Sequence, residues 1–410
     1  MLPSDTQFRS APLYWLALGA FAIGTEGFMV AAILPNIATD LSVSLVAAGQ
    51  VVAIFSLAYG LSSPILTTLT GRVGRRTLLI WSMAVFVLAN LVAAAVPNYW
   101  SLVAARILLA FAAGLYVPGA NAVAGAMVAP ERRGRAIAII NGGLSIAVTL
   151  GVPMGAVIGN ALGWRMTFVG VAGLSAIALI GLVLGLPKDV GAGMTTASFR
   201  GRLAVVRTPG VLPSLLVTLL WAMGSYTVYT YITPFMSHLV SVEGRDIGAI
   251  LFLWGAAAAT GLFISGSATD RFGSRRVIGI ALFLATAALS SLSVWAHLLS
   301  PQAALVPAVI SVIVWGMAHW GFWPAQQANL IGIAGLKVAS VALSLNASSM
   351  YLGFFLGASL GSLTLQHLSS IELGWVGGGG IFLSLILFIL VIRPKKAATG
   401  QRAWCAETPR

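Results

Sequence analysis

One carboxylate and one guanidinium lie inside helix-length apolar segments of this chain. Glu26 stands near the middle of residues 13–35 (LYWLALGAFAIGTEGFMVAAILP), and Arg106 lies within residues 101–123. A helix needs about 20 apolar residues to cross the hydrocarbon core of a bilayer, which is about 30 Å thick. An ionisable side chain at that depth is costly unless it is paired, neutral or facing water, so such residues usually serve ion or substrate pathways. The two residues therefore indicate proton or ligand movement across a membrane.

The depths of the two residues allow them to meet. At a rise of about 1.5 Å per residue, Glu26 lies about 13 Å and Arg106 about 9 Å below the outer ends of their segments. A nearby arginine favours the ionised form of a carboxyl group, whereas burial favours the neutral form. The alternatives are a static clamp between two helices and a neutral Glu26 bonded to a neighbouring backbone.

Further polar and aromatic residues are candidates for binding. His319, in WGMAHWGFWPAQQ, is a second candidate proton carrier because the ordinary pKa of histidine is about 6.5, although a hydrogen-bonded core histidine is the alternative. Rings and amides that combine stacking faces with hydrogen bonds suit amphipathic ligands; for each of them, packing or an interfacial aromatic belt is the alternative. The predicted cavity residues are Tyr226, Tyr229, Tyr231, Trp315, Trp320, Trp323, Asn121, Asn141, Asn346 and Tyr351.

The composition predicts an integral membrane protein. The 410 residues are 59% hydrophobic and 8% charged, whereas soluble domains average about 25% charged residues. The chain has four His and ten acids, with no metal-ligand spacing, phosphate-binding loop or nucleophile elbow, so we expect neither an enzyme nor a metal, a cofactor or ATP. The single Cys405 excludes an intrachain disulfide.

Apolar runs predict twelve membrane spans and an all-α fold. They cover residues 13–35, 45–69, 77–96, 101–123, 136–160, 166–186, 211–236, 247–266, 277–296, 303–325, 338–366 and 374–392. One alternate set of loops and tails holds 20 of the 23 Lys and Arg residues, and the other holds only Arg165 and Arg245. Positive residues stay in the cytoplasm, so both termini are predicted there. Because the basic residues flank spans, the net charge of +13 does not indicate nucleic acid.

An internal repeat divides the spans into two groups of six. Residues 187–209 form the longest polar break, and TLTGRVGRR at 68–76 recurs as ATDRFGSRR at 268–276. Such repeats are typical of transporters whose halves rock about a midplane site. We therefore predict two six-helix bundles, residues 1–186 and 210–393, with a linker at 187–209 and a cytoplasmic tail at 394–410.

The repeated loop resembles that of the major facilitator superfamily, and the resemblance covers essentially the whole chain. The second copy holds the complete motif at Gly266, Asp270, Arg271, Gly273 and Arg275. In the first copy Thr67 and Gly71 replace the Gly and the Asp, whereas Arg72, Gly74, Arg75 and Arg76 remain. The resemblance implies a gating role, because a carboxylate at one helix end can hold a neighbouring helix or Arg in one conformation and release it in another. Gly71 cannot do this.

Two further segments resemble the drug:proton antiporter branch. In the fifth span Gly151, Pro153, Gly155 and Gly159 resemble its signature; small residues allow close helix packing, and proline bends a helix. The fourth span begins like the family motif, with Leu102-x-x-x-Arg106 followed by Leu109 and Ala110 at the usual Gln and Gly positions. Within the branch, TEGFMVAAILPNIA and GWRMTF are most similar to bacterial sugar, arabinose, purine and chloramphenicol efflux proteins.

The resemblance implies a monomeric, proton-coupled exporter of small molecules in a bacterial inner membrane, working by alternating access. Glu26 and Arg106 then line a central cavity, where a proton or substrate loosens their contact. The alternative is a facilitator or proton symporter that imports a neutral solute. A receptor or enzyme without transport is a third possibility, against which the repeat and the missing catalytic motifs stand. Sugars, nucleosides, phenicol-like drugs and lipophilic cations all fit, because a shared scaffold does not name a substrate.

Overall fold

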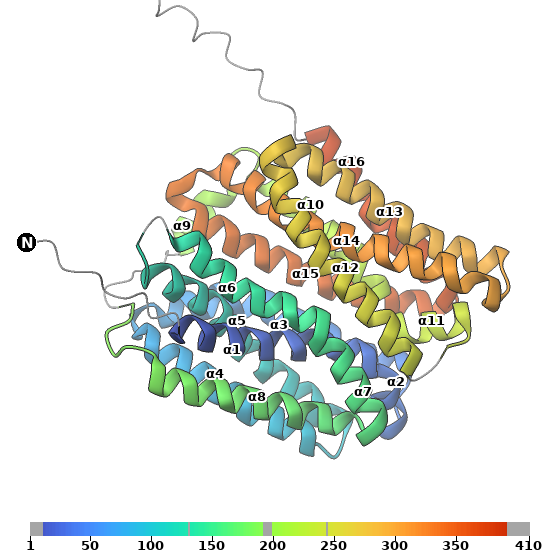
Figure 1. The fold of residues 1–410 in the computed structure, drawn as a ribbon, viewed down its shortest axis with the longest axis horizontal. Helices are drawn as coiled ribbons and strands as arrows, with labels where there is room; N and C mark the ends of the chain where they lie inside the picture. The colour runs from blue at the N-terminus through green and yellow to red at the C-terminus, as the bar shows by residue number, and fades with distance from the viewer. Residues whose placement is uncertain (1–10, 130–131, 192–198, 243–244, 392–410) are drawn as a thin grey trace, which may run out of the picture.

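The computed structural model describes residues 11–129, 132–191, 199–242 and 245–391. The predicted tail at 394–410 and part of the predicted linker, 192–198, lie outside the described residues. Within the described ranges the ordered elements are all helical, and twelve spans are long and apolar enough to cross a membrane. The predicted fold class is thereby confirmed: the chain is an all-α membrane protein with two six-helix bundles (Figure 1).

The span ends agree with the apolar runs to within a few residues at most positions. In the first half the helices are α1 (Ala11–Met29), α2 (Leu34–Asp40), α3 (Leu45–Leu69), α4 (Arg75–Ala95), α5 (Tyr99–Ala126), α6 (Arg133–Ile146), α7 (Val152–Leu162) and α8 (Trp164–Gly185). The connecting segment and second half contain α9 (Phe199–Val206), α10 (Val211–Tyr229), α11 (Ile232–Val240), α12 (Arg245–Phe272), α13 (Ser274–Leu298), α14 (Pro301–Ala334), α15 (Ala339–His367) and α16 (Leu373–Val391).

Three spans are built from two helical pieces rather than the single helices that were predicted. A 3₁₀ segment separates α1 from α2, a π-helical turn separates α6 from α7, and Thr230 and Tyr231 separate α10 from α11. In each case the second piece has a proline in its first turn, at Pro35, Pro153 and Pro234. Proline lacks a backbone N–H and clashes with the preceding turn, so the helix is interrupted there.

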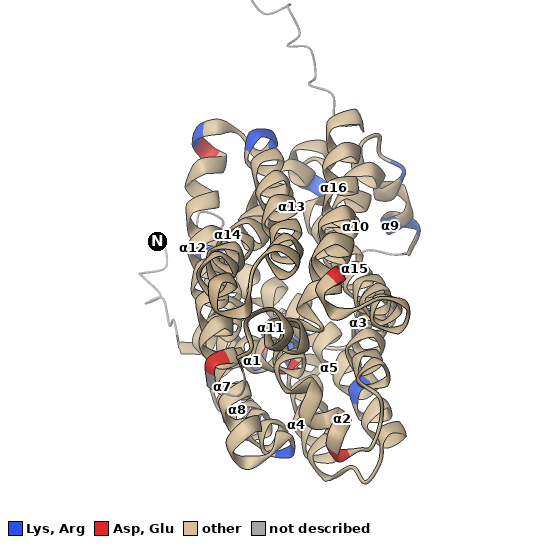
Figure 2. Ribbon diagram, turned by 90° about the vertical axis from the view of Figure 1, so that its right-hand side faces the viewer, with Lys and Arg blue, Asp and Glu red and all other residues tan. Residues whose placement is uncertain are grey.

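The two halves lie side by side with their helices roughly parallel. In Figure 1 the first half, α1 to α8, occupies the lower part and the second half, α10 to α16, the upper part. Figure 2 looks along the helices, and most of the ribbon there carries no charged residue. The halves pack together through α3 against α15, and through α7 with its preceding π-helical turn against α12.

The two ends of the molecule differ in charge and in the pieces that form them. One end, which we call the arginine-rich end, carries the basic loops after α3 and α12, with Arg72, Arg75, Arg76, Arg271, Arg275 and Arg276. The connecting helix α9 also lies at this end, and α2, α7 and α11 lie at the opposite end (Figure 1). The positive-inside rule predicts that the arginine-rich end faces the cytoplasm.

Candidate functional site

The site is centred on an ion pair buried inside the first half. Glu26 lies on α1 and Arg106 on α5, and Nη1 of Arg106 donates a hydrogen bond to Oε1 of Glu26. Both side chains are 0% exposed. The Arg106 guanidinium also lies 4.1 Å from the ring centroid of Phe55, on α3. Removal of either partner would leave an uncompensated buried charge, which costs about 3–5 kcal/mol.

Several polar atoms of this ion pair have no partner among the described residues. Oε2 of Glu26 and both Nε and Nη2 of Arg106 are buried without a hydrogen bond. The hydroxyl of Thr25, the next residue along α1, is in the same condition. Buried polar groups are normally bonded, and an unsatisfied one costs about 1–3 kcal/mol. One acceptor and two donors beside a buried charge pair can receive a proton, a water molecule or a polar ligand group.

Glycines of the predicted antiporter motif set the separation between α1 and the α6–α7 span. A Cβ added to Gly151 would lie 2.1 Å from Oγ1 of Thr25, and one added to Gly159 would lie 2.4 Å from Cγ2 of Ile33. Gly155, one turn from each, also faces this helix pair interface. Residues four apart lie on one helix face, so the three glycines form a continuous strip without side chains, which we call the glycine ridge, against the span that carries the carboxylate.

The proline of the same motif accompanies an irregular turn at the contact between halves. The π-helical turn Ala147–Gly151 directly precedes α7, and Pro153 lies at the start of α7. The backbone hydrogen bonds of a π-helical turn join residues five apart instead of four apart, and such turns occur often at functional sites. Oγ1 of Thr149, inside the turn, donates to the carbonyl oxygen of Gly255 on α12 at 2.9 Å. The predicted bend therefore lies where the first half contacts the second.

A group of aromatic rings extends from the ion pair into the second half. The rings of Tyr226 and Phe354 are stacked with centroids 3.5 Å apart, and Phe28 lies 5.8 Å from Trp320. The ring of Tyr351 lies 5.4 Å from that of Phe354, and Phe28 stands on the same helix as Glu26, two residues after it. We call these rings, together with one neighbour, the aromatic cluster: Phe28, Tyr226, Tyr229, Trp320, Tyr351 and Phe354. Stacking faces next to a charge pair suit amphipathic ligands.

His319 lies on α14 in the second half, whereas the ion pair lies in the first half, and it has its own partners. Nδ1 of His319 is 2.7 Å from Oγ of Ser225, and its ring stacks on Trp221 with centroids 4.2 Å apart. Trp315, another predicted cavity residue, donates from Nε1 to the same hydroxyl at 3.4 Å. His319 and Trp315 are 2% and 1% exposed. Within the described residues, the contacts of His319 are therefore those of a packed and bonded histidine.

The three predicted asparagines are not gathered at the ion pair. Oδ1 of Asn346 accepts from Thr218 at 2.7 Å, in a buried network that also includes Gln326. Asn121 is fifteen residues from Arg106 along α5, which is about 22 Å of helix, and it donates to the carbonyl of the preceding turn. Asn141 is half-buried on α6. Two further predicted residues, Tyr231 and Trp323, contact Ser362 and Trp221 respectively.

Hydrogen bonds between the halves gather toward the end opposite the arginine-rich one. The hydroxyl of Tyr229 donates to the carbonyl oxygen of Phe28 at 3.2 Å. Thr233 lies 3.4 Å from the carbonyl oxygens of the 3₁₀ segment, and Gln50 donates to Ser362 at 2.8 Å. These neutral bonds join α10 and α11 to the first span and α3 to α15. They hold the two halves together toward the opposite end.

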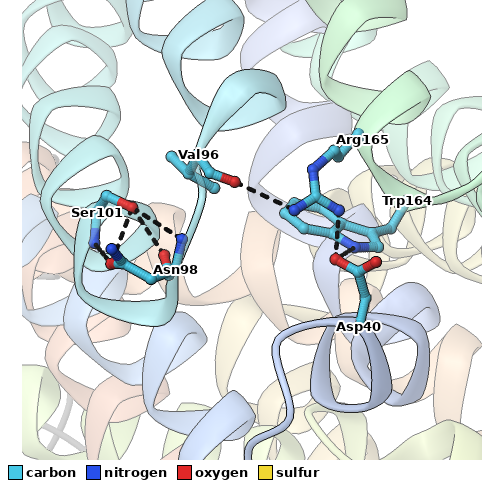
Figure 3. A network of polar contacts seen from close by, with 6 residues as sticks. All are labelled: Asp40, Val96, Asn98, Ser101, Trp164 and Arg165. Atoms are coloured by element: carbon cyan, nitrogen blue, oxygen red, sulfur yellow. Dashed lines mark hydrogen bonds and ion pairs between the residues drawn. The ribbon is translucent and has the colours of Figure 1, made fainter.

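A charged network holds the opposite end of the first half (Figure 3). Arg165 at the start of α8 pairs with Asp40 of α2, and its Nη2 donates to the carbonyl oxygen of Val96 at 3.1 Å. The indole of Trp164 donates to the same carboxylate at 3.2 Å. Asn98 forms a capping box with Ser101 beside this network. Three spans of one half are thus tied together at this end.

The two copies of the loop motif differ in structure. Gly273 has a φ of 82°, which favours glycine, whereas the equivalent Gly74 has a φ of −56° that any residue adopts. Arg75 is buried, whereas Asp270 and Arg271 are exposed, and the described residues show no ion pair to Asp270. Gly266 faces open space and Arg275 is half-buried. The gating role predicted for these residues stays a prediction.

Several contacting residues were not singled out from the sequence. Phe28 and Phe354 complete the aromatic cluster, Phe55 covers Arg106, and Tyr59 stacks on Tyr351 with centroids 3.6 Å apart. Phe28 stands two residues after Glu26 and so lies near the same depth in the membrane, and this proximity could have identified it as a site residue from the sequence. The other three are aromatic residues in apolar segments, where rings are common and give no indication of their partners.

Comparisons with known proteins agree with this architecture. The chain is 31% identical over 389 residues to the uncharacterized MFS-type transporter YbcL of Bacillus subtilis, covering 94% of this chain and 97% of that protein. It is 32% identical to the inner membrane transport protein YdhP of Escherichia coli, covering 87% and 89%. It is 31% identical to a chloramphenicol resistance protein of Streptomyces lividans, covering 63% and 67%.

A solved structure with the same fold is that of a D-xylose-proton symporter, with a TM-score of 0.81 at 16% identity, covering 95% of this chain and 99% of the symporter. The sequence profile of the Major Facilitator Superfamily matches residues 16–240 and again 214–406. The second match repeats the first about 200 residues later, as the internal repeat requires. The chain is thus a multi-pass transporter and belongs to the major facilitator superfamily.

Proposed function

We propose that this protein is a proton-coupled secondary transporter that exports small molecules by alternating access, with the arginine-rich end in the cytoplasm. The observation that carries the proposal is the buried pair of Glu26 and Arg106, whose unpartnered Oε2, Nε and Nη2 atoms can bond to a proton or to a ligand. In the described spans this is the one acid–arginine pair with both side chains fully buried. A carboxylate inside a membrane protein usually serves such a pathway.

The coupling step follows from competition at this pair. A proton and a donor group of the ligand compete for Oε2 of Glu26, so protonation disfavours ligand binding and a bound ligand disfavours protonation. Each proton that moves inward across about 100 mV supplies about 2.3 kcal/mol. Release of substrate on the outer side then accompanies protonation, if both compete for the same place. The kinship to a chloramphenicol resistance protein supports export as the direction.

The substrate site we propose lies between the ion pair and the aromatic cluster, where the two halves meet. Tyr226 and Tyr351 belong to the second half, and their ring centroids lie 6.4 Å from that of Phe28 and 3.6 Å from that of Tyr59 in the first half. A ligand there contacts both halves, so its binding energy can favour one arrangement of the halves over another. Rings with few charges favour neutral or weakly basic amphipathic compounds.

The test is Glu26→Gln in purified protein reconstituted into liposomes, with chloramphenicol as the first probe of a ligand panel. We expect the variant to bind the ligand but to fail to accumulate it under a proton gradient, and wild type to release a proton on binding. Glu372→Gln makes the same chemical change at a partly exposed acid that contacts His297, and it should behave as wild type. Full proton-driven accumulation by Glu26→Gln would refute the mechanism and make His319 the next residue to test. Ligand flux that ignores uncouplers would favour a facilitator instead.

A further inference from the structure

A buried arginine from the connecting helix contacts both halves of the transporter. Arg202 lies on α9, and its Nη1 donates to Oγ of Ser344 on α15 at 3.0 Å. Its Nη2 donates to Oγ1 of Thr67 on α3 at 3.1 Å. The side chain is 8% exposed, although the helix that carries it lies at the arginine-rich end of the molecule. One guanidinium thus joins the last turn of α3 to the first turns of α15, and these two spans belong to different halves.

The buried environment of Arg202 distinguishes it from a loop arginine that only sets the orientation of the protein in the membrane. Its neighbour on the same helix, Arg200, is exposed, as expected for a residue that only marks the side of the membrane. Burying a guanidinium requires partners that replace water, and the partners here are two neutral hydroxyls. Nε of Arg202 is buried without a partner among the described residues. Two hydrogen bonds to neutral hydroxyls can hold the ends of the two helices together, and no carboxylate opposes their release.

One of the two acceptors of Arg202 is supplied by the first copy of the loop motif. Thr67 stands where the second copy has Gly266, and a glycine offers no hydroxyl to an arginine. Oγ1 of Thr67 donates its own proton to the carbonyl oxygen of Ser63 at 2.6 Å, so its lone pairs are oriented to accept from Arg202. The same copy has Gly71 where the second has Asp270, so it lacks the carboxylate. The link through Thr67 therefore occurs in the copy that lacks the carboxylate.

We propose that Arg202 is a latch residue that holds the ends of α3 and α15 together at the arginine-rich end and must release one of them when the halves separate there. This inference rests on the proposed alternating-access function, because a latch matters only if the halves move. Arg202 touches neither the ion pair nor the aromatic cluster in the structure. It acts through the position of the two helices.

The test measures the separation of the helix ends directly. In a Cys405→Ser background, spin labels are placed at Leu69→Cys and Leu336→Cys, which are 73% and 86% exposed at the ends of α3 and before α15. Distances are recorded in lipid nanodiscs without ligand. Loss of a hydrogen bond to a charged group changes an equilibrium about tenfold or more, so Arg202→Ala should shift the ratio of short to long distances toward long by at least that factor. Arg200→Ala, the matched control, should leave the ratio unchanged.

Two further variants keep the charge and remove one acceptor each. Thr67→Val and Ser344→Ala should each produce a smaller shift, and Arg202→Ala added to either should give less than the sum of the single effects. If the variants at Arg202, Thr67 and Ser344 all give the same ratio of short to long distances as Arg200→Ala, the latch does not exist, even if proton-driven transport is normal. If the distances shift as expected while Glu26→Gln transports normally, the latch is supported and the proposed coupling is refuted. The two proposals therefore fail separately.

Discussion

Substitution of Gly151 by alanine should damage the site without touching either charged residue. The added Cβ would lie 2.1 Å from Oγ1 of Thr25 and 2.9 Å from both Cβ and Cγ2 of the same residue. Real Cβ atoms do not approach other atoms this closely, so α1 or the π-helical turn must shift. Overpacking of this kind typically costs about 1–3 kcal/mol. Alanine in place of a helical glycine gains about 0.5–1 kcal/mol when there is space, so the net loss should lie between about 0 and 2.5 kcal/mol.

The matched control is Gly173→Ala on α8, where an added Cβ meets no atom within 4 Å. Thermal unfolding of both variants in the same detergent should show Gly151→Ala less stable than wild type and Gly173→Ala equal to it or more stable. Because the residue that clashes is adjacent to Glu26, Gly151→Ala should also reduce proton-driven accumulation in liposomes, and Gly173→Ala should not. Equal stability and equal transport for the two variants would show that the glycine ridge does not position α1, and the reasoning from close packing would fail.

Three other substitutions test separate contacts. Arg76→Ala should lower thermal stability by about 1–2 kcal/mol relative to the exposed Arg72→Ala, because Arg76 donates to two carbonyl oxygens at the end of α8 at 2.7 and 3.1 Å; equal melting curves would contradict this. Asp270→Asn should slow turnover in liposomes and leave ligand affinity, measured by titration, nearly intact; a large loss of affinity with normal turnover would contradict its gating role. His319→Gln should retain proton-driven accumulation, because its contacts are those of a packed residue; loss of coupling with unchanged ligand binding would assign the proton to His319 instead.

The spans could be predicted from the sequence because their length is fixed by the bilayer, and an apolar run records that length directly. The interruptions inside spans could not be located in the same way. Pro35, Pro153 and Pro234 accompany breaks, whereas Pro64 and Pro118 lie inside continuous helices, α3 and α5. A proline removes one donor in either case. Whether the helix then breaks depends on what packs against it, and the sequence does not contain that information in local form.

The site was predictable only where its residues are rare in membranes. Glu26 and Arg106 stood out because charged residues inside apolar segments need a reason, and their depths placed them within reach of each other. Phe28 and Tyr59 did not stand out, because an aromatic ring in an apolar segment packs with whatever lies near. Arg202 was grouped with the topological charges of its loop. A loop charge shows on which side it lies, but its hydrogen-bond partner depends on the packing of α9 against two distant spans.

The position of the ion pair constrains how coupling can work. Glu26 and Arg106 both belong to the first half, on α1 and α5, so a rocking motion of one half against the other carries the two together and does not separate them. What such a motion does change is the surroundings of the pair. The second half supplies Tyr226, which contacts the ring of Phe28, Tyr351, which stacks on Tyr59, and Tyr229, whose hydroxyl donates to the carbonyl oxygen of Phe28. Under the proposed mechanism, we expect protonation of Glu26 to depend on the access of water and ligand to its Oε2 as the second half moves away, and we expect a substrate that bridges the halves to determine when that access opens.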